Sequence, residues 1–122
     1  MKKIVTFGEM MMRLKPSNMK RVLQANQFDV DYGGSEANVA VSLSLFGDQA
    51  AYVTKLPDNV LGQAATDKLR EYGVDTSLVQ YGGPRLGMYV FEKGHSVRAT
   101  KVTYERAGSS FATSKVAEYD WS

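Results

Sequence analysis

The chain has 122 residues, of which 43% are hydrophobic, and its 15 basic and 13 acidic side chains leave a net charge of +2. A chain of this size and composition can bury the core of one compact domain, but it is too short for two. The basic residues are scattered along the sequence, so no nucleic-acid partner is expected. The chain has no cysteine and one histidine, which excludes a disulfide framework, a thiolate metal site and a histidine metal cluster.

The first residues are basic, as in a signal peptide, but Glu9, Arg13 and Lys15 interrupt any apolar region behind them. No apolar run in the sequence approaches the length of a membrane-spanning helix. The lack of cysteine agrees with a reducing compartment. The sequence therefore predicts a soluble cytoplasmic protein without a membrane partner.

The first elements along the chain are predicted to be strands. Residues 4–7 form a β-branched and aromatic run closed by Gly8, which is typical of a buried strand at the start of a parallel sheet. Residues 10–14 could extend that strand. Residues 28–32 alternate between aromatic or aliphatic side chains and aspartates, which predicts a half-exposed strand.

The sequence then predicts a helix. Ser35 is the expected N-cap of a segment that runs to residue 46, and Gly47 occupies the position after the helix that favours left-handed geometry. This segment is apolar on most sides. We therefore expect it to be buried against a sheet.

A strand at residues 51–54 and a second helix follow. Asp58 is the expected cap of this helix, and Gly73 is expected to end it. Four larger or apolar side chains recur between them at helical spacing: Leu61, Ala65, Leu69 and Tyr72. The alternation of strands and helices predicts an α/β fold.

The last third of the chain predicts a β-hairpin. Residues 86–92 and 97–104 read as two strands joined by residues 93–96, which have turn chemistry. In the second strand, Val97 and Ala99 have one parity and Val102 and Tyr104 have the other. This change predicts a bulge or bend near residues 100–101.

The glycine pair Gly33-Gly34 is the most informative local feature. Without Cβ atoms, the backbone can come close to a ligand at the positive end of the following helix. The alternative is that the pair only turns the chain into that helix. The pattern is neither a phosphate-binding Gly-Lys-Ser/Thr loop nor a Gly-x-Gly-x-x-Gly dinucleotide fingerprint, so physical reasoning leaves both readings open.

The segment Gly-Gly-Ser-Glu-Ala-Asn-Val-Ala at residues 33–40, with Gly47 behind it, resembles the first signature of the PfkB carbohydrate kinases. In that family the glycine pair and the asparagine line the sugar pocket. The resemblance therefore implies that Gly33, Gly34 and Asn38 bind substrate. Within the family, the likeness is greatest to 2-keto-3-deoxygluconate kinases, through three segments: residues 8–14, 86–89 and 104–109.

The resemblance covers the whole chain and implies a ribokinase-like α/β fold, with a Rossmann-like core and a small β lid. Residues 1–122 are expected to form the N-terminal part of one such domain. The lid segments are expected at about residues 10–32 and 86–106. In this family the lid often forms the dimer interface, so a homo-oligomer through the lid is expected.

Tyr104 and Arg106 have the chemistry to bind an acid sugar. Residues two apart in an extended segment point the same way, so this phenol and guanidinium could reach one ligand. A guanidinium fork matches a carboxylate, which keto-deoxygluconate has and ribose or fructose lacks. The alternative is a solvated arginine beside a packed tyrosine. The resemblance favours substrate contact, and it implies Tyr89 as a further contact.

Two other features limit the function. Ribose-type members of the family carry an aspartate after the first strand to hold a sugar diol, and Arg13 stands at that place here, which argues against ribose or a nucleoside. No Gly-x-Gly-Asp motif, the family's catalytic signature, occurs in these residues. Phosphoryl transfer needs such a carboxylate and a nucleotide platform with a divalent metal.

The sequence thus predicts a parent protein that uses ATP and Mg²⁺ to make the 6-phosphate of 2-keto-3-deoxygluconate. The 122-residue chain alone is expected to supply the sugar-binding half, to bind no nucleotide or metal, and to be inactive. Its uncovered apolar faces predict poor solubility or self-association. The alternatives are another PfkB sugar kinase, such as a fructokinase, and a non-catalytic α/β module that binds a small acid or a protein.

Overall fold

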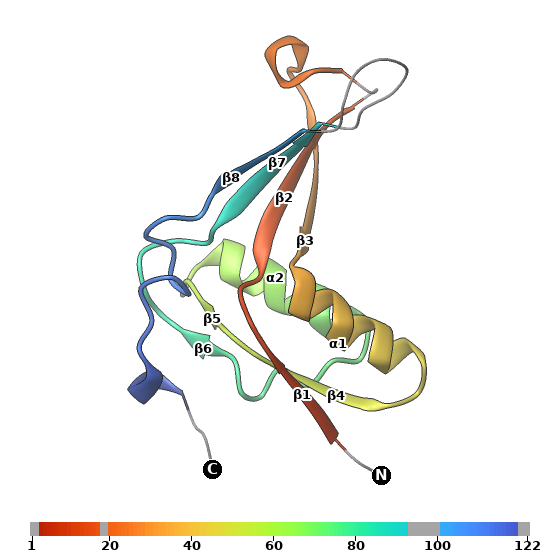
Figure 1. The fold of residues 1–122 in the computed structure, drawn as a ribbon, viewed down its shortest axis with the longest axis vertical. Helices are drawn as coiled ribbons and strands as arrows, with labels where there is room; N and C mark the ends of the chain where they lie inside the picture. The colour runs from red at the N-terminus through yellow and green to blue at the C-terminus, as the bar shows by residue number, and fades with distance from the viewer. Residues whose placement is uncertain (1–2, 18–19, 93–100, 120–122) are drawn as a thin grey trace.

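Two groups of strands organise the chain. The computed structural model describes residues 3–17, 20–92 and 101–119. An α/β part contains the strands β1, β4, β5 and β6 with two helices, and a four-stranded sheet rises from one end of it (Figure 1). The strands and helices are β1 (Lys3–Phe7), β2 (Met11–Pro16), β3 (Phe28–Gly33), α1 (Ser35–Leu45), β4 (Gln49–Val53), β5 (Lys55–Leu56), α2 (Val60–Glu71), β6 (Gln80–Tyr81), β7 (Met88–Glu92) and β8 (Lys101–Glu105), with short 3₁₀ turns at Val22–Gln24 and Val116–Glu118.

The parallel strands β1 and β4 form the base of the α/β part. They pair from Lys3 with Gln49 to Phe7 with Val53, as the prediction of a parallel sheet requires. The prediction that the first strand is buried was wrong for the described residues, since Val5 is 53% exposed. The reason is that, in the part of the chain that the structure describes, β1 pairs with β4 alone and its other edge is uncovered. The strand expected at residues 51–54 starts earlier, and β5 pairs with a strand, β6, that was not predicted.

Helix α1 begins and ends close to its predicted limits, but its burial differs. Gly34, rather than Ser35, is the N-cap, and no side chain caps the helix. At the other end Gly47 has a φ of 92°, as predicted for the residue after a helix. Only the small side chains Ala37 and Ala40 are buried, and Leu45 is 66% exposed. The helix therefore packs against the strands β1 and β4, as expected, but it does so with one narrow face and leaves other apolar side chains exposed.

Helix α2 is capped by Asn59 and not by Asp58. The Asn59 side chain accepts hydrogen bonds from the backbone N–H groups of Leu61 and Gly62, at 3.0 and 3.1 Å. This start places the buried stripe on Gly62, Ala65, Thr66 and Leu69, which follow one another at helical spacing. Leu61 lies beside the stripe and is 40% exposed, contrary to the prediction.

The hydrophobic core lies between the helices, β4 and β5, and the start of the upper sheet. Tyr52, Leu56 and Leu69 are fully buried in it, and Met10 reaches it from the segment between β1 and β2. Met11, the next residue, is also buried, but it lies at the groove described below. No helix in the described ranges has the length and apolar character needed to cross a membrane.

The upper sheet has the strand order β3-β2-β7-β8 and is made from the two segments expected to form a lid. β2 pairs antiparallel with β3 and parallel with β7, and β7 pairs antiparallel with β8. The two strands of the predicted hairpin are therefore paired, and β7 begins at Met88 rather than at residue 86. The expected turn at residues 93–96, Val97, Ala99 and the proposed bulge near residue 100 lie outside the described residues.

The register of this sheet separates two kinds of side chain. Directly paired residues share a face, so Asp31, Arg13, Tyr89 and Tyr104 form one row across all four strands. The neighbouring row on the opposite face contains Val30, Leu14, Val90 and Thr103. One face of the sheet therefore carries Arg13, Tyr89 and Tyr104, and the other carries aliphatic side chains together with charged ones at Glu92, Lys101 and Glu105.

Asp75 ties the segment after α2 to both base strands. Its backbone N–H donates to the carbonyl of Ala50 at 2.9 Å, and its carbonyl accepts from Tyr52 at 3.1 Å. Its carboxylate accepts hydrogen bonds from the Lys3 ammonium and, at 2.9 Å, from the Ser77 backbone N–H. These contacts lower the pKa of Asp75 from 3.8 to about 2. The hydrogen bond from Lys3 is the largest cause, and the hydrogen bond from Ser77 is the next.

Replacing Asn59 by Ala removes the side-chain cap of α2 and is expected to lower the free energy of unfolding by about 1 kcal/mol. Asp58→Ala is the matched control, because this exposed neighbour caps nothing in the described structure; its effect should stay within about 0.5 kcal/mol. Urea unfolding of both variants measures the difference. A larger loss for Asp58→Ala than for Asn59→Ala would contradict the observed cap.

A group whose pKa is lower in the folded state stabilises the fold above its ordinary pKa, and this stability is lost as the group is protonated. Asp75 should therefore contribute fully above pH 3.8 and progressively less as the pH falls toward about 2. The difference in unfolding free energy between wild type and Asp75→Asn should shrink over that interval. Asp58→Asn is the control, and a pH-independent difference for Asp75→Asn would refute the assignment.

Candidate functional site

A groove lies between the N-terminus of α1 and the polar face of the upper sheet. It consists of two adjoining pockets of about 260 and 360 Å³, which share the lining residues Met11, Ser35 and Tyr104. We call it the sheet-side groove. The pocket of about 260 Å³ is also lined by Arg13, Gly34, Asn38, Tyr89, Phe91 and Val102. The pocket of about 360 Å³ is also lined by Phe7, Gly8, Glu9, Glu36, Arg106 and Phe111.

Gly34 is a glycine because the backbone of Glu9 passes directly over it. A Cβ atom at Gly34 would lie 2.3 Å from the Glu9 carbonyl oxygen, which is closer than real Cβ contacts allow. The backbone of Gly34 is extended, with φ near 180°, so conformational freedom is not the reason. At Gly33 a Cβ would meet only the Asn38 side-chain oxygen, at 3.2 Å. The close approach lets α1 begin directly below the upper sheet.

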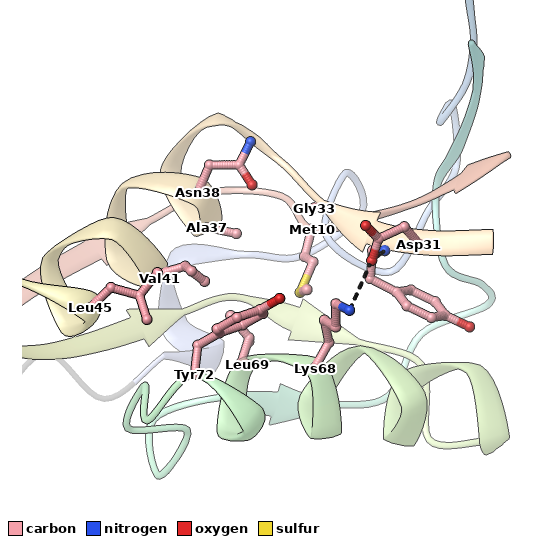
Figure 2. Close-up of a pocket in the computed structure, with 11 residues that line it drawn as sticks. Met10, Asp31, Gly33, Ala37, Asn38, Val41, Leu45, Lys68, Leu69 and Tyr72 are labelled. Carbon is pink, nitrogen blue, oxygen red and sulfur yellow. Dashed lines mark hydrogen bonds and ion pairs between the residues drawn. The ribbon is translucent and has the colours of Figure 1, made fainter. Parts of the chain in front are cut away.

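The first turn of α1 supplies polar groups to the groove. Its positive dipole end lies at Gly34 and Ser35, which both line the 260 Å³ pocket. Asn38 lies one turn further along, and its amide can both donate and accept hydrogen bonds. In Figure 2 this amide points away from the apolar side chains of Val41 and Tyr72.

Aromatic rings form the opposite wall of the groove. Tyr89 on β7 and Tyr104 on β8 are directly paired, and their ring centroids are 5.7 Å apart at an interplanar angle of 37°. Arg13 on β2 is paired with Tyr89, and its guanidinium lies 5.6 Å from the centre of the Phe91 ring. This wall therefore offers phenol hydroxyls, flat apolar surface and one cation.

Arg106 stands at the far end of the same wall. Its guanidinium carbon lies 5.5 Å from the centre of the Tyr104 ring, and its Nε atom lies 3.4 Å from a carboxylate oxygen of Glu9. The Arg106 side chain is 53% exposed, whereas that of Glu9 is only 7% exposed. The arginine is thus held on one side and remains accessible on the other.

Five of the six residues predicted from the sequence line this groove, and the sixth, Gly33, lies beside it. Gly34, Asn38, Tyr89 and Tyr104 line one pocket, and Arg106 lines the adjoining one with Tyr104. Gly33 lines a small recess of about 60 Å³ together with Arg13, Asn38 and Tyr89. The expectation that Tyr104 and Arg106 face the same space is confirmed as geometry; their roles in binding stay a prediction.

Sequence reasoning missed Arg13 and Phe91 as groove residues. Arg13 drew notice only as the replacement of an aspartate, and Phe91 only as part of a strand. The available signal was parity, because Phe91 is two residues from Tyr89 and must share its face. Arg13 could not be placed in this way, since its position depends on the parallel pairing of β2 with β7, which lies far along the chain.

A second cavity, the helix cleft, lies between α1 and α2 and has a volume of about 230 Å³. Figure 2 shows Val41, Leu45, Leu69 and Tyr72 around it, with the ion pair between Lys68 and Asp31 at its edge. The Lys68 ammonium lies 3.4 Å from the Asp31 carboxylate, which raises the pKa of Lys68. Its walls are mainly apolar, so it suits a polar sugar less well than the sheet-side groove.

The sheet-side groove can recognise a small polar ligand. Amide, hydroxyl and backbone groups from α1 face phenols on the sheet, and the two arginines can bind a negative group. Among the residues that the structure describes, no group of three His, Cys, Asp or Glu side chains could hold a metal ion.

Comparisons with known proteins agree on one family. The family model described as pfkB family carbohydrate kinase matches residues 1–122. The crystal structure of 2-dehydro-3-deoxygluconokinase from Thermotoga maritima superposes with a TM-score of 0.96 at 50% identity, over 98% of this chain and 36% of that one. The ribokinase-like α/β fold predicted from the sequence is therefore confirmed.

Two curated relatives add to this comparison. A 2-dehydro-3-deoxygalactonokinase from Haloferax volcanii is 39% identical over 94% of this chain and 36% of its own length. Fructokinase-1 from Zea mays is 34% identical over 86% of this chain and 30% of its own length. The chain thus spans about a third of the length of these relatives. It belongs to the pfkB family of carbohydrate kinases.

Proposed function

We propose that this chain is the sugar-binding part of an ATP-dependent kinase that converts 2-keto-3-deoxygluconate to its 6-phosphate. The observation that carries the proposal is the position of Arg106, stacked on Tyr104 in the groove that also contains Gly34 and Asn38. In this arrangement a sugar chain lies over the N-terminus of α1, and its carboxylate reaches the arginine.

The chemistry of the ligand supports an acid sugar. A carboxylate accepts charge-assisted hydrogen bonds from a guanidinium, and these are stronger than bonds between neutral groups. Fructose and ribose have no such group, so Arg106 would add nothing comparable to their binding. The Thermotoga and Haloferax relatives are both named for keto-deoxy sugar acids, which supports this substrate class. Because the chain is also similar to the maize fructokinase, a neutral sugar is the second candidate substrate.

ATP is the expected phosphate donor, and a divalent metal would neutralise charge on the transferred phosphoryl group. The described residues do not fit a metal site of three acidic or histidine ligands. The role of these residues in the proposed reaction is to bind and orient the sugar so that its terminal hydroxyl is held in place.

The upper sheet is proposed to act as a lid over the sugar and as a contact between subunits. A lid excludes water, which would otherwise compete for the phosphoryl group. The face of the sheet opposite the groove carries Leu14, Val30 and Val90, and Val30 is 54% exposed. Exposed aliphatic side chains of this kind support pairing with a second copy.

Replacing Arg106 by Ala in the full-length protein is expected to raise the KM for 2-keto-3-deoxygluconate by about 10- to 100-fold, because one charged hydrogen-bond donor group is lost. Any activity with fructose should change little. Arg70→Ala is the control, since Arg70 lies on α2 and bonds Thr76 away from the groove. An unchanged KM for the acid sugar, with fructose as the better substrate, would favour the fructokinase alternative.

Replacing Gly34 by Ala should raise the sugar KM by at least about tenfold, because the Cβ would push the start of α1 away from the backbone of Glu9. Gly33→Ala is the matched comparison. Its Cβ would meet only the movable side chain of Asn38, so its effect should be smaller. Steady-state kinetics of both full-length variants tests this order, and equal effects would contradict it.

A further inference from the structure

Glu9 is a buried acid that touches the arginine of the proposed substrate site. One of its carboxylate oxygens lies 3.4 Å from Nε of Arg106, and the other accepts a 2.7 Å hydrogen bond from the Ser109 hydroxyl. Its side chain is only 7% exposed. A buried carboxylate is costly unless it is paired and hydrogen-bonded, so its position depends on these two partners.

Ser109 is hydrogen-bonded to both Arg106 and Glu9. Its backbone N–H donates to the carbonyl of Arg106 at 3.2 Å, while its hydroxyl donates to Glu9. The same hydroxyl oxygen accepts from the Ala112 backbone N–H at 3.1 Å. The carboxylate is therefore attached both to the guanidinium and to the turn that follows it in the chain.

Glu9 also fits closely against the glycines on either side. A Cβ at Gly87 would lie 2.5 Å from the second carboxylate oxygen of Glu9 and 3.2 Å from Cβ of Arg106. The backbone carbonyl of Glu9 covers Gly34 in the same way. Glu9 thus lies between the glycine that starts α1 and the arginine of the opposite wall, and a side chain at either Gly34 or Gly87 would displace it.

The side of the Arg106 guanidinium that Glu9 contacts determines which of its N–H groups remain to bind a substrate. A guanidinium carries N–H groups on Nε and on both Nη atoms, in one plane. Glu9 lies beside Nε, and the ring of Tyr104 lies 5.5 Å from the guanidinium carbon, which limits rotation of that plane. The Arg106 side chain as a whole is 53% exposed, so the Nη atoms, which Glu9 does not contact in this ion pair, are left to bind a carboxylate as a fork.

From these contacts we propose that Glu9 is a positioning residue, which holds the Arg106 fork toward the sugar carboxylate and thereby sets the preference for acid over neutral sugars. The inference rests on the proposed function, because it takes Arg106 as the carboxylate-binding group. Glu9 itself does not bind the acid sugar in this account. Its effect on binding passes entirely through Arg106.

A double-mutant cycle in the full-length kinase tests the inference. Glu9→Gln, Arg106→Ala and the double variant are compared by steady-state kinetics with 2-keto-3-deoxygluconate at saturating ATP. Glu9→Gln should raise the KM about fivefold while kcat changes less than about twofold. In the Arg106→Ala background, the same change at Glu9 should raise the KM by less than about twofold, because nothing remains to be positioned.

Three outcomes would overturn the proposal. They are an unchanged KM for Glu9→Gln, an equal loss with and without Arg106, and a fall in kcat without a change in KM. If Arg106→Ala alone leaves the KM unchanged, Arg106 does not bind the sugar carboxylate, and the proposed function is contradicted. The Glu9 variants test the positioning role by itself.

A second variant covers the case in which Glu9→Gln does not fold. Ser109→Ala removes the other partner of the carboxylate and leaves Glu9 and Arg106 intact. In a protein whose melting temperature shows that it is folded, this variant should raise the KM for the acid sugar and not for fructose. If its KM for the acid sugar equals that of the wild type, the proposal is wrong.

Discussion

The close approach of the Glu9 backbone to Gly34 is the contact on which the rest of the site depends. It brings the segment between β1 and β2 directly over the start of α1, and no side chain fits between them. The polar end of the helix therefore faces the upper sheet across a short distance. The same segment carries the Glu9 carboxylate to Arg106, so one crossing of the backbone positions both walls of the groove.

The register of the upper sheet brings the side chains of one groove wall together. Arg13, Tyr89 and Tyr104 come from three strands, yet they form one row because directly paired residues share a face. Leu14, Val30 and Val90 occupy alternate positions and face away from the groove. The proposed sugar-binding surface and the proposed subunit contact would lie on opposite faces of one sheet, because successive residues of a strand point to opposite faces.

Much of the fold and part of the site could be predicted from local sequence. Glycines mark both ends of α1, and the two-residue spacing of Tyr104 and Arg106 places them on one side of an extended chain. The contact of Glu9 with Ser109 could not be predicted, since it joins residues 100 positions apart. The exposure of β1 and of most of α1 was also missed, because apolar composition does not tell how many neighbours an element has.

The central claim is that the sheet-side groove binds an acid sugar with its carboxylate on Arg106. A crystal structure of the full-length protein with 2-keto-3-deoxygluconate tests it most directly. The account predicts the carboxylate at hydrogen-bonding distance from the Nη atoms of Arg106, beside Tyr104, with the sugar chain over Gly34 and Asn38. A sugar bound in the helix cleft near Lys68, or with its carboxylate turned away from Arg106, would contradict the account.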